Sequence, residues 1–544
     1  MEFSYLQRQG IIRRLKDEKF DILIIGGGIT GAGTLREAAM RGLKTALIEK
    51  EDFAYGTSSR SSKLIHGGLR YLEQKDFSLV FESTQERALL MKKLASHLVK
   101  PVPFILPVYK NERHSPLKLS LGLWLYDILG LFRTYKLHKR LSASRLSLLE
   151  PGINGEGLRG GFLYYDCLTD DARLTFETAL SGFRHGGLPA NYIEFIRPVR
   201  NGSGKFCGAV VLDRITGEVF TIKSSFLVSA AGPWTDETAS RLSGKECSLL
   251  RVTKGVHFTV VSDILPVKHA FVMTSPVDGR TMFAIPWHGL TIIGTTDTDY
   301  SGSPDNVAAD RTDIEYLLAS VKKYFPGAAI SSSDIISTWA GLRPLVREDR
   351  IEESQVSREH HIWIYPENYA LIAGGKLTTF RIMARELIDY ILPALFPGKK
   401  VPASGAGTVP LPYFQGSPSK DEYLNEKEVL VSRYGLAPES ADHLIGTYGG
   451  RVSKFMHYLD GDRSLGKRIC DSLPYIRCEI LHAVRHEMTM NVSDFLMRRT
   501  QMCLRMRDNG AAIAETVSGE IQKYYQDYKE ISNKELDKYL TNIR

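Results

Sequence analysis

Apolar residues form the first clear pattern of the chain at residues 20–25, FDILII, directly before the glycine-rich string GGGITG. A helix-compatible stretch runs from Ala32 to Arg41, and a second apolar run from Leu43 to Ile48 ends at Glu49. Short apolar runs bounded by turn residues are typical of buried strands. Two strands around one helix within about thirty residues predict a βαβ unit, the frame that a bound dinucleotide needs.

Strands and helices are mixed through the middle of the chain. Apolar runs predict further strands at 206–212, 220–229, 257–261, 291–294, 361–365 and 370–373. Helical periodicity predicts helices at 171–185, 312–325 and 380–392. Together with the opening βαβ unit, this mixture predicts an α/β fold.

The last part of the chain has a different pattern. Residues 401–419 contain four prolines and several Gly and Ser residues, which predicts a linker. Helices are expected beyond it at 420–434, 438–448, 476–489 and 492–505, within a helical domain at 420–515. A charged tail at 516–544 is expected to be a solvated helix or a fraying end. The N-terminus lacks the apolar core of a signal peptide and predicts a short solvated helix.

One apolar segment, Pro116–Phe132, carries only Lys118 and Asp127 as charged residues. It is at the lower limit of a membrane span, and its central charge argues against crossing. Two interpretations remain open: a buried helix, or an apolar face lying in a membrane interface. In the second case, the membrane contact is expected from Leu119, Leu121, Leu123, Trp124 and Leu125.

Length and composition narrow the class of protein. The 544 residues predict two or three domains. Hydrophobic residues at 43% and charged residues at 24% exclude a mainly disordered chain and a polytopic membrane protein. The six cysteines form no Cys-x-x-Cys pair, which indicates a reducing compartment and no disulfide framework or metal site. The net charge of +8 fits an anionic substrate or lipid surface; no nucleic-acid partner is expected.

The glycine spacing carries the first chemical signal. Gly26, Gly28 and Gly31 follow a predicted strand and open a predicted helix, so the backbone can approach a pyrophosphate at the helix N-terminus. Glu49, at the end of the next strand, can accept hydrogen bonds from ribose hydroxyls and would repel a 2′-phosphate. These residues predict a dinucleotide site that disfavours an NADP-type ligand.

A second cradle favours FAD over NAD. The loop at residues 57–71, TSSRSSKLIHGGLRY, has many small residues that let backbone lie against a large planar ligand. Two further strand-then-glycine segments occur at 226–232, followed by Pro-Trp, and at 370–375, followed by KLTT. The second opens a helix, whose N-terminus would favour negative charge on a reduced flavin ring.

These strings together resemble FAD-dependent glycerol-3-phosphate dehydrogenases, within the flavoproteins folded like D-amino acid oxidase. The resemblance rests on DILIIGGGITGAG, GTSSRSSKLIHGGLRYLE, TDDARLT, AAGPW, IIGTTDTDY, GLRPL and GGKLTTFR. It extends from about residue 20 to about residue 505, past the string DFLMRRT.

The resemblance implies a Rossmann-like FAD-binding domain interleaved with an antiparallel-sheet substrate domain, followed by a helical C-terminal domain. The oxidoreductase region is expected at 20–400. Its FAD-binding segments are expected at about 20–100, 145–235 and 335–400, and the substrate domain mainly at about 101–144 and 236–334.

The resemblance also implies the reaction: oxidation of sn-glycerol 3-phosphate to dihydroxyacetone phosphate by hydride transfer to FAD, with electrons passed to a membrane quinone. The implied flavin contacts are Gly26, Gly28, Gly31, Glu49, Ser58, Ser59, Lys63, Leu64, His66, Gly68, Gly232, Lys376, Leu377 and Thr378. The implied substrate pocket comprises Arg70, Tyr71, His257, Arg343 and Lys376.

The residue types at the implied pocket suit this reaction. Oxidising a carbinol carbon requires a base for the hydroxyl proton, for which His257 ranks first and His66 second. A phosphate monoester requires Arg or Lys, and Arg343 lies in an apolar, glycine-containing string that would bury a charge needing an anion. From the residues alone, a lone histidine on a strand is more often structural, and only the resemblance favours a catalytic role for His257. A surface ion pair is the alternative for Arg343.

Three classes of function therefore compete: a membrane-associated dehydrogenase, an oxidase that passes electrons to O2 and makes H2O2, and a flavin-binding protein without catalysis. The dehydrogenase is favoured because every implied pocket position is filled and the insertion typical of the oxidase branch is not seen. A cytoplasmic protein, peripheral on the cytoplasmic face of the inner membrane, is expected, and a homodimer is left open.

Overall fold

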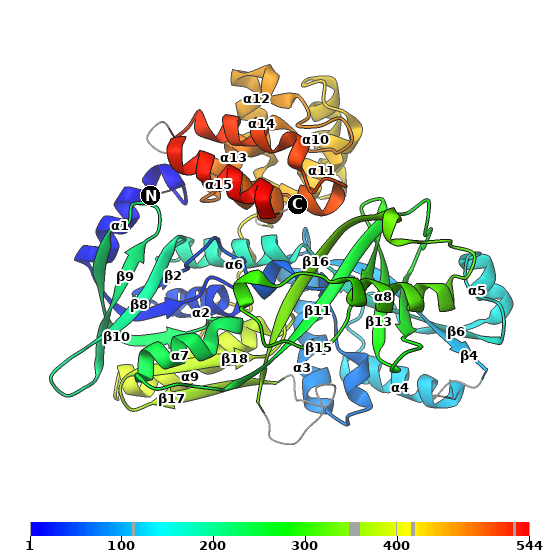
Figure 1. The fold of residues 1–544 in the computed structure, drawn as a ribbon, viewed down its shortest axis with the longest axis horizontal. Helices are drawn as coiled ribbons and strands as arrows, with labels where there is room; N and C mark the ends of the chain where they lie inside the picture. The colour runs from blue at the N-terminus through cyan, green and yellow to red at the C-terminus, as the bar shows by residue number, and fades with distance from the viewer. Residues whose placement is uncertain are drawn as a thin grey trace.

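Two β-sheets and a set of C-terminal helices make up the molecule (Figure 1). The computed structural model describes residues 2–110, 115–347, 359–398, 400–414, 419–525 and 529–542. The C-terminal helices lie at the top of the view, above both sheets.

The first sheet is built around the predicted βαβ unit. Strand β1 (Lys19–Ile25) pairs in parallel with β2 (Thr45–Ile48) and β10 (Val219–Ser229). The strand order is β17-β18-β10-β1-β2-β7, and β9 and β8 extend it antiparallel from β10. The other strands are β7 Leu188–Ala190, β8 Ile193–Arg200, β9 Phe206–Asp213, β17 His360–Tyr365 and β18 Tyr369–Gly374.

Helices cover this sheet and bring the glycine turn against it. Helix α2 (Ile29–Met40) packs on α6 (Asp171–Arg184) and α9 (Phe380–Leu395). Helix α1 (Arg8–Asp17) contacts β7 and β10, and α7 (Thr235–Ser243) contacts β8, β10 and β18. Because both faces are covered, residues 22–25 of β1 are buried, which explains their continuous apolar run.

The second sheet is mostly antiparallel, in the order β15-β11-β14-β13-β12-β4-β6-β3, with β16 paired to β11 and β5 to β6. Only the β12–β4 pair in this sheet is parallel among the described strands. The strands are β3 Leu64–Ile65, β4 Lys100–Tyr109, β5 Lys139–Ser142, β6 Leu158–Leu168, β11 Leu250–Val261, β12 Ala270–Thr274, β13 Thr281–Trp287, β14 Leu290–Gly294, β15 Thr298–Asp299 and β16 Ile335–Val346. Helices α3 (Phe77–Leu89), α4 (Pro116–Leu129), α5 (Ala143–Leu149) and α8 (Arg311–Tyr324) flank it.

Three strands within the expected FAD-binding segments belong to the second sheet. Strands β3 and β4 pair with β6, and β16 pairs with β11 along nearly its whole length. The resemblance implied FAD-binding segments that contain β3, β6 and β16, because an apolar run identifies a strand but not its pairing partner. The other domain boundaries stay predictions.

The C-terminal helices are α10 Lys420–Ser432, α11 Pro438–Tyr448, α12 Val452–Gly461, α13 Arg477–His486, α14 Ala511–Gln522 and α15 Lys529–Asn542. The single helix expected at 492–505 is wrong. The chain instead forms a π-helical turn at Asp494–Arg499 and a 3-10 turn at Met502–Arg505, because Gln501 between them is left-handed (φ 54°). Part of the expected linker, residues 415–418, lies outside the described residues.

The expected charged tail is not simply solvated. Its described part continues α14 and forms α15, and Tyr525 and Tyr539 from it are buried in the C-terminal core.

Helix α4 reconciles the two interpretations of the apolar segment. Ser115 caps it by accepting a hydrogen bond from the Lys118 backbone N–H at 3.3 Å, and Pro116 occupies the first turn. Leu123 and Tyr126 are buried, whereas Leu121 and Trp124 are exposed. One apolar face therefore packs and another faces outward. Among the described residues, no helix is long and apolar enough to cross a membrane.

Candidate active site

A cavity that is partly open to solvent, with about 1300 Å³ of empty space, lies at the carboxyl ends of β1, β2 and β10. In open α/β sheets ligands bind at this edge. Its lining includes seven residues that the sequence assigned to the cofactor or substrate: Gly26, Gly28, Glu49, Ser58, Gly232, Lys376 and Leu377.

The turn between β1 and α2 shows why glycine is required at two positions. Gly26 has φ +106°, and a Cβ there would lie 2.5 Å from the Ala230 carbonyl oxygen. A Cβ on Gly31 would overlap the carbonyl oxygen of Gly26. Ser58 reaches the start of the helix, where its Oγ accepts a hydrogen bond from the Ile29 N–H at 2.9 Å. Residues 28–30 at the N-terminus of α2 line the cavity, where the positive end of the helix dipole suits an anion.

Glu49 is fixed beside this turn. Its carboxylate accepts hydrogen bonds from the Gly27 N–H at 2.6 Å and the Glu51 N–H at 2.9 Å. Burial raises the pKa of Glu49, and the two backbone hydrogen bonds counteract that shift. The side chain lines the cavity in one orientation, which suits an acceptor for vicinal ribose hydroxyls.

Sequence reasoning missed part of the cavity wall. Phe195, Trp234 and Arg241 line it, and Lys50 lies over the Trp234 ring at 4.4 Å. The string AAGPW was the available signal for Trp234. For Phe195 and Arg241 no local signal existed, because strand pairing and helix packing bring them to the cavity.

The predicted substrate residue His257 lies in β11. Its imidazole is 2% exposed and stacks on Trp339 of β16, with ring centroids 5.0 Å apart and planes 8° apart. Nε2 of His257 lies 2.8 Å from Ser62 Oγ. Nδ1 has no hydrogen-bond partner among the described residues. This leaves one nitrogen of a buried imidazole for a further polar group.

Arg343 lies on the same sheet, four residues beyond Trp339 along β16. Its Nη1 donates to Asp297 at 2.9 Å, and its Nη2 donates to Thr295 Oγ1 at 2.9 Å. Burial lowers the pKa of His257 well below its ordinary 6.5, and the charges of Arg343 and Lys63 lower it further. The imidazole is therefore neutral at physiological pH, as a general base must be.

Lys376 links the two ends. It lines the cavity, and its Nζ lies 3.5 Å from the centroid of the Tyr71 ring. Gly68 has a left-handed backbone (φ 75°), which brings the chain at this residue close to Tyr71 and Lys376. The cavity also includes Ser61, which precedes Ser62, and Pro344, which follows Arg343. Of the predicted substrate residues, Lys376 lines the cofactor cavity and Tyr71 contacts Lys376.

Several predicted cofactor residues are not in the cavity lining: Gly31, Ser59, Lys63, Leu64, His66, Gly68 and Thr378. Lys63 is fully buried and its Nζ lies 2.9 Å from Asp171 Oδ1, so its ammonium is directed to a carboxylate rather than into the cavity. His66 and Thr378 bond each other through the His66 backbone, at 3.2 Å in both directions. The roles of these residues and of Arg70 stay predictions.

A dinucleotide cavity at the carboxyl edge of a parallel sheet, beside an antiparallel sheet with a neutral buried histidine, defines a flavin-type oxidoreductase. The chain belongs to the FAD-dependent oxidoreductases: the profile of that family matches residues 21–390. A second profile, the C-terminal domain of alpha-glycerophosphate oxidase, matches residues 399–530.

Named relatives agree with this family. The chain is 36% identical over 507 residues to the aerobic glycerol-3-phosphate dehydrogenase of Staphylococcus haemolyticus, covering 92% of this chain and 90% of that protein. It is 35% identical over 514 residues to the protein of the same name from Staphylococcus aureus strain USA300, covering 93% and 91%.

Solved structures extend the likeness to three dimensions. The glycerol-3-phosphate dehydrogenase from Bacillus halodurans, complexed with FAD, superposes with a TM-score of 0.81 at 28% identity, covering 99% of this chain and 98% of that chain. The L-alpha-glycerophosphate oxidase of Mycoplasma pneumoniae shares the fold, with a TM-score of 0.55 at 18% identity over 73% of this chain and 100% of that chain.

FAD is the cofactor of this family, and the residues present fit it. The glycine turn leaves no space for a Cβ, the Glu49 carboxylate faces the cavity, and the buried indole Nε1 of Trp234 has no hydrogen-bond partner among the described residues. These are the phosphate, ribose and ring-edge contacts that a flavin dinucleotide needs.

Proposed function

We propose that this protein oxidises sn-glycerol 3-phosphate to dihydroxyacetone phosphate and passes the electrons to a membrane quinone. The observation that carries the proposal is His257: a neutral, buried imidazole whose Nδ1 has no hydrogen-bond partner among the described residues, on the same sheet as Arg343 and in contact with Ser62, which follows Ser61 of the cavity lining. The relatives named aerobic glycerol-3-phosphate dehydrogenase supply the substrate class.

The side chains divide the chemistry between them. FAD, when bound, supplies the two-electron oxidant. The C2 hydroxyl must lose its proton as the C2–H bond breaks and the carbonyl forms, and His257 accepts that proton. Arg343 and Lys376 hold the phosphate of the substrate, with the planar guanidinium suited to two parallel hydrogen bonds.

A spectral experiment tests the proposed reaction. Under anaerobic conditions, sn-glycerol 3-phosphate should bleach the flavin absorbance of the purified protein, and glycerol should not. Glycerol lacks the phosphate whose contacts with Arg343 and Lys376 supply the binding energy. Bleaching by both compounds, or by neither, would contradict the proposed substrate.

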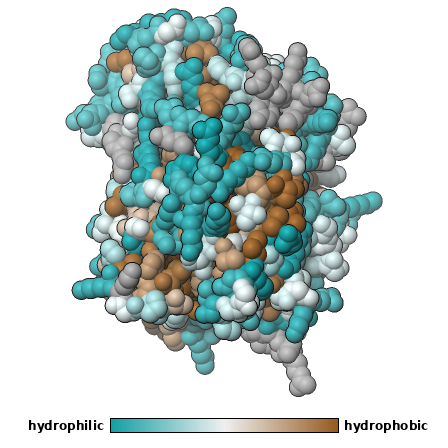
Figure 2. Space-filling view, turned by 90° about the vertical axis from the view of Figure 1, so that its left-hand side faces the viewer, coloured by the Kyte–Doolittle hydropathy of each residue, from teal (hydrophilic) through white to brown (hydrophobic). Residues whose placement is uncertain are grey.

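The membrane part of the proposal rests on α4 and the turn after it. Leu117 is 72% exposed and Leu121 63% exposed, and Trp124, Ile128 and Phe132 are exposed as well. Figure 2 shows the left-hand side of Figure 1, which is mainly hydrophilic with limited apolar patches. Helix α4 lies away from that side, at the lower right of Figure 1.

Exposed basic residues flank this apolar face: Lys118, Arg133, Lys136, Lys139 and Arg140. An apolar strip bordered by cations fits an anionic lipid surface, and each inserted large side chain would contribute about 1 kcal/mol or more. We therefore place the enzyme on the cytoplasmic face of the inner membrane, where the reduced cofactor can meet a quinone.

The buried position of Leu123 changes the expected membrane contact and the variant that tests it. At 1% exposed, Leu123 belongs to the core and not to the lipid contact. The double variant Leu121→Glu/Trp124→Glu should move the protein from vesicles containing anionic lipid to the supernatant and slow quinone reduction, while dye-linked activity stays unchanged. The matched control is Val219→Glu/Ile364→Glu, which places two charges on exposed apolar positions of the other sheet. Equal vesicle binding by both double variants would remove α4 from the membrane contact.

A second candidate function is the oxidase, because the C-terminal match is to the domain of alpha-glycerophosphate oxidase. Substrate-dependent H2O2 formation in air, without quinone or dye, distinguishes the two. Peroxide formed as fast as quinone is reduced would favour the oxidase.

A further inference from the structure

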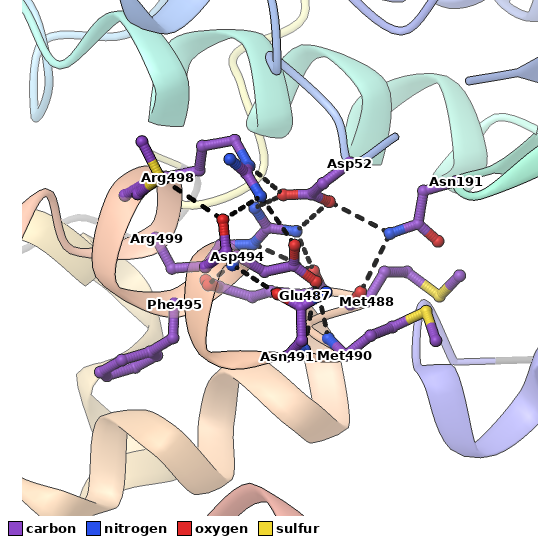
Figure 3. A network of polar contacts seen from close by, with 12 residues as sticks. Asp52, Asn191, Glu487, Met488, Met490, Asn491, Asp494, Phe495, Arg498 and Arg499 are labelled. Carbon is purple, nitrogen blue, oxygen red and sulfur yellow. Dashed lines mark hydrogen bonds and ion pairs between the residues drawn. The ribbon is translucent and has the colours of Figure 1, made fainter. Parts of the chain in front are cut away.

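Two strings that mark the family resemblance, TDDARLT at 169–175 and DFLMRRT at 494–500, have no part in the site described so far. The structure brings them together in a buried polar network between the C-terminal helices and the oxidoreductase region. Figure 3 shows the part of this network around Asp52, Glu487, Arg498 and Arg499. Arg498 and Arg499 both bond to Asp52, at 2.7 and 2.8 Å. Arg173 donates to Glu487 at 2.8 Å and to the Arg499 carbonyl at 3.1 Å. The network anchors the turn at 494–499 firmly against α6.

Gln501 connects this anchored turn to Asp170 and Asp171 at the start of α6. It follows the anchored turn, is 2% exposed and has the left-handed backbone that ends the helical segment. Its Nε2 donates to Asp170 Oδ1 at 2.9 Å and to Asp171 Oδ1 at 3.1 Å. A residue of the C-terminal region thus fixes the two carboxylates at the start of α6.

Asp171 in turn holds the loop before β3. Its Oδ2 accepts from the Ser61 N–H at 3.1 Å and from the Ser61 hydroxyl at 2.7 Å. Its Oδ1 accepts from Lys63 Nζ at 2.9 Å, and both side chains of this ion pair are fully buried. Residues 61 and 63 are therefore held on either side of Ser62.

Ser62 is the point where the loop meets His257. Its Oγ lies 2.8 Å from Nε2, while the indole Nε1 of Trp339, which stacks on the imidazole, donates to the Ser61 carbonyl at 3.1 Å. The hydrogen bond on one ring nitrogen of a histidine determines which nitrogen carries the proton. When Ser62 accepts from Nε2–H, Nδ1 keeps the lone pair that can take a proton.

We infer that Gln501, Asp171 and Ser62 are positioning residues for the oxidation, acting in series to orient the imidazole of His257. The inference rests on the proposed function, because it assigns the proton-accepting role to His257. It makes the C-terminal region part of the catalytic frame, although none of the described residues of that region lines the cavity.

The first test uses Ser62, where the series meets the imidazole. Ser62→Ala should slow anaerobic flavin reduction at saturating substrate by about 10- to 100-fold, the loss expected from a misplaced catalytic group. Its KM should change much less. Ser62→Thr, which keeps the hydroxyl, should restore most of the rate.

The second test separates positioning from simple destabilisation. Gln501→Ala should slow flavin reduction by about 3- to 10-fold and shift the acid limb of its pH profile, because the proton-accepting nitrogen is held less firmly. The control is Tyr525→Phe, which removes a buried hydrogen bond to the Thr489 carbonyl in the same C-terminal core without touching residues 61–63. It should lower the melting temperature at least as much and leave the reduction rate and pH profile unchanged.

The outcomes distinguish this inference from the proposed function. Wild-type flavin that sn-glycerol 3-phosphate does not reduce would overturn the proposed function. Wild-type reduction with an unaltered rate and pH profile in both Ser62→Ala and Gln501→Ala would overturn the positioning role alone. Equal losses in Gln501→Ala and Tyr525→Phe would also overturn it, since stability would then explain the effect.

Discussion

The nucleotide end of the site is built mainly from backbone, whereas the substrate end is built from side chains of distant segments. At the nucleotide end, a Cβ does not fit at Gly26 or Gly31, and Glu49 is held by two backbone N–H groups. At the proposed substrate end, His257 contacts Ser62 and stacks on Trp339, and the charge of Arg343 lowers its pKa further below the value set by burial. Substitutions at the nucleotide end should therefore weaken FAD binding. Substitutions at the substrate end should lower the rate of flavin reduction while FAD stays bound.

The largest effect is expected from His257. His257→Ala removes the proton acceptor, so the rate of flavin reduction should fall by about 10²–10⁴-fold while FAD remains bound. Stopped-flow absorbance with sn-glycerol 3-phosphate measures the rate. A near-normal rate, with a large loss in His66→Ala instead, would transfer the base role to His66.

A smaller effect is expected at Glu49. Glu49→Gln keeps the shape but loses the charged acceptor for the ribose hydroxyls, so FAD should bind more weakly by about 1.5–3 kcal/mol. The substrate KM should be unchanged in enzyme saturated with FAD. Glu51→Gln is the control, because its side chain bonds Arg214 outside the cavity, and it should retain FAD like the wild type. Equal retention of FAD by Glu49→Gln and Glu51→Gln would contradict a role for Glu49 in binding FAD.

Gly31→Ala tests whether backbone space, and not side-chain chemistry, limits the nucleotide end. The added methyl group would overlap the Gly26 carbonyl, and the resulting shift of the turn should cost about 1–3 kcal/mol in FAD binding or stability. Gly519→Ala in α14 meets nothing within 4 Å and should have no destabilising effect. Titration with FAD and thermal unfolding of the apoprotein would measure the two contributions.

The smallest effect is expected from Arg343→Lys, and it should appear in KM. The charge stays but the planar fork is lost, so KM should rise by about tenfold, or ~1.4 kcal/mol, and activity should partly recover at high substrate concentration.

Arg343→Gln tests the role of the Arg343 charge through the pH profile. The Arg343 charge lowers the pKa of His257, so its removal should raise that pKa, and the base should become protonated at a higher pH. The acid limb of the reduction rate should therefore move upward in Arg343→Gln and stay in place in Arg343→Lys.

The sequence carried enough information for the nucleotide end because that end is local. A strand, three glycines at fixed spacing, a helix and a terminal Glu49 occupy residues 19–49, and each constraint acts on near neighbours. The same locality explains why most predicted strands and helices lie within a few residues of the observed ones. The helix at 492–505 was the exception, because the left-handed Gln501 is held by buried contacts to residues far away in the sequence.

Only the tertiary structure decided the substrate end and the two faces of α4. Ser62 and His257 are 195 residues apart, and Gln501 and Asp171 are 330 residues apart, so no spacing pattern could have paired them. Likewise, the apolar run at 116–132 did not reveal that Leu123 packs inward while Leu121 faces outward. The physical reason is the same in both cases. Burial and hydrogen bonding depend on which surfaces meet after folding, whereas the sequence alone specifies which backbone conformations and apolar stripes are available to meet.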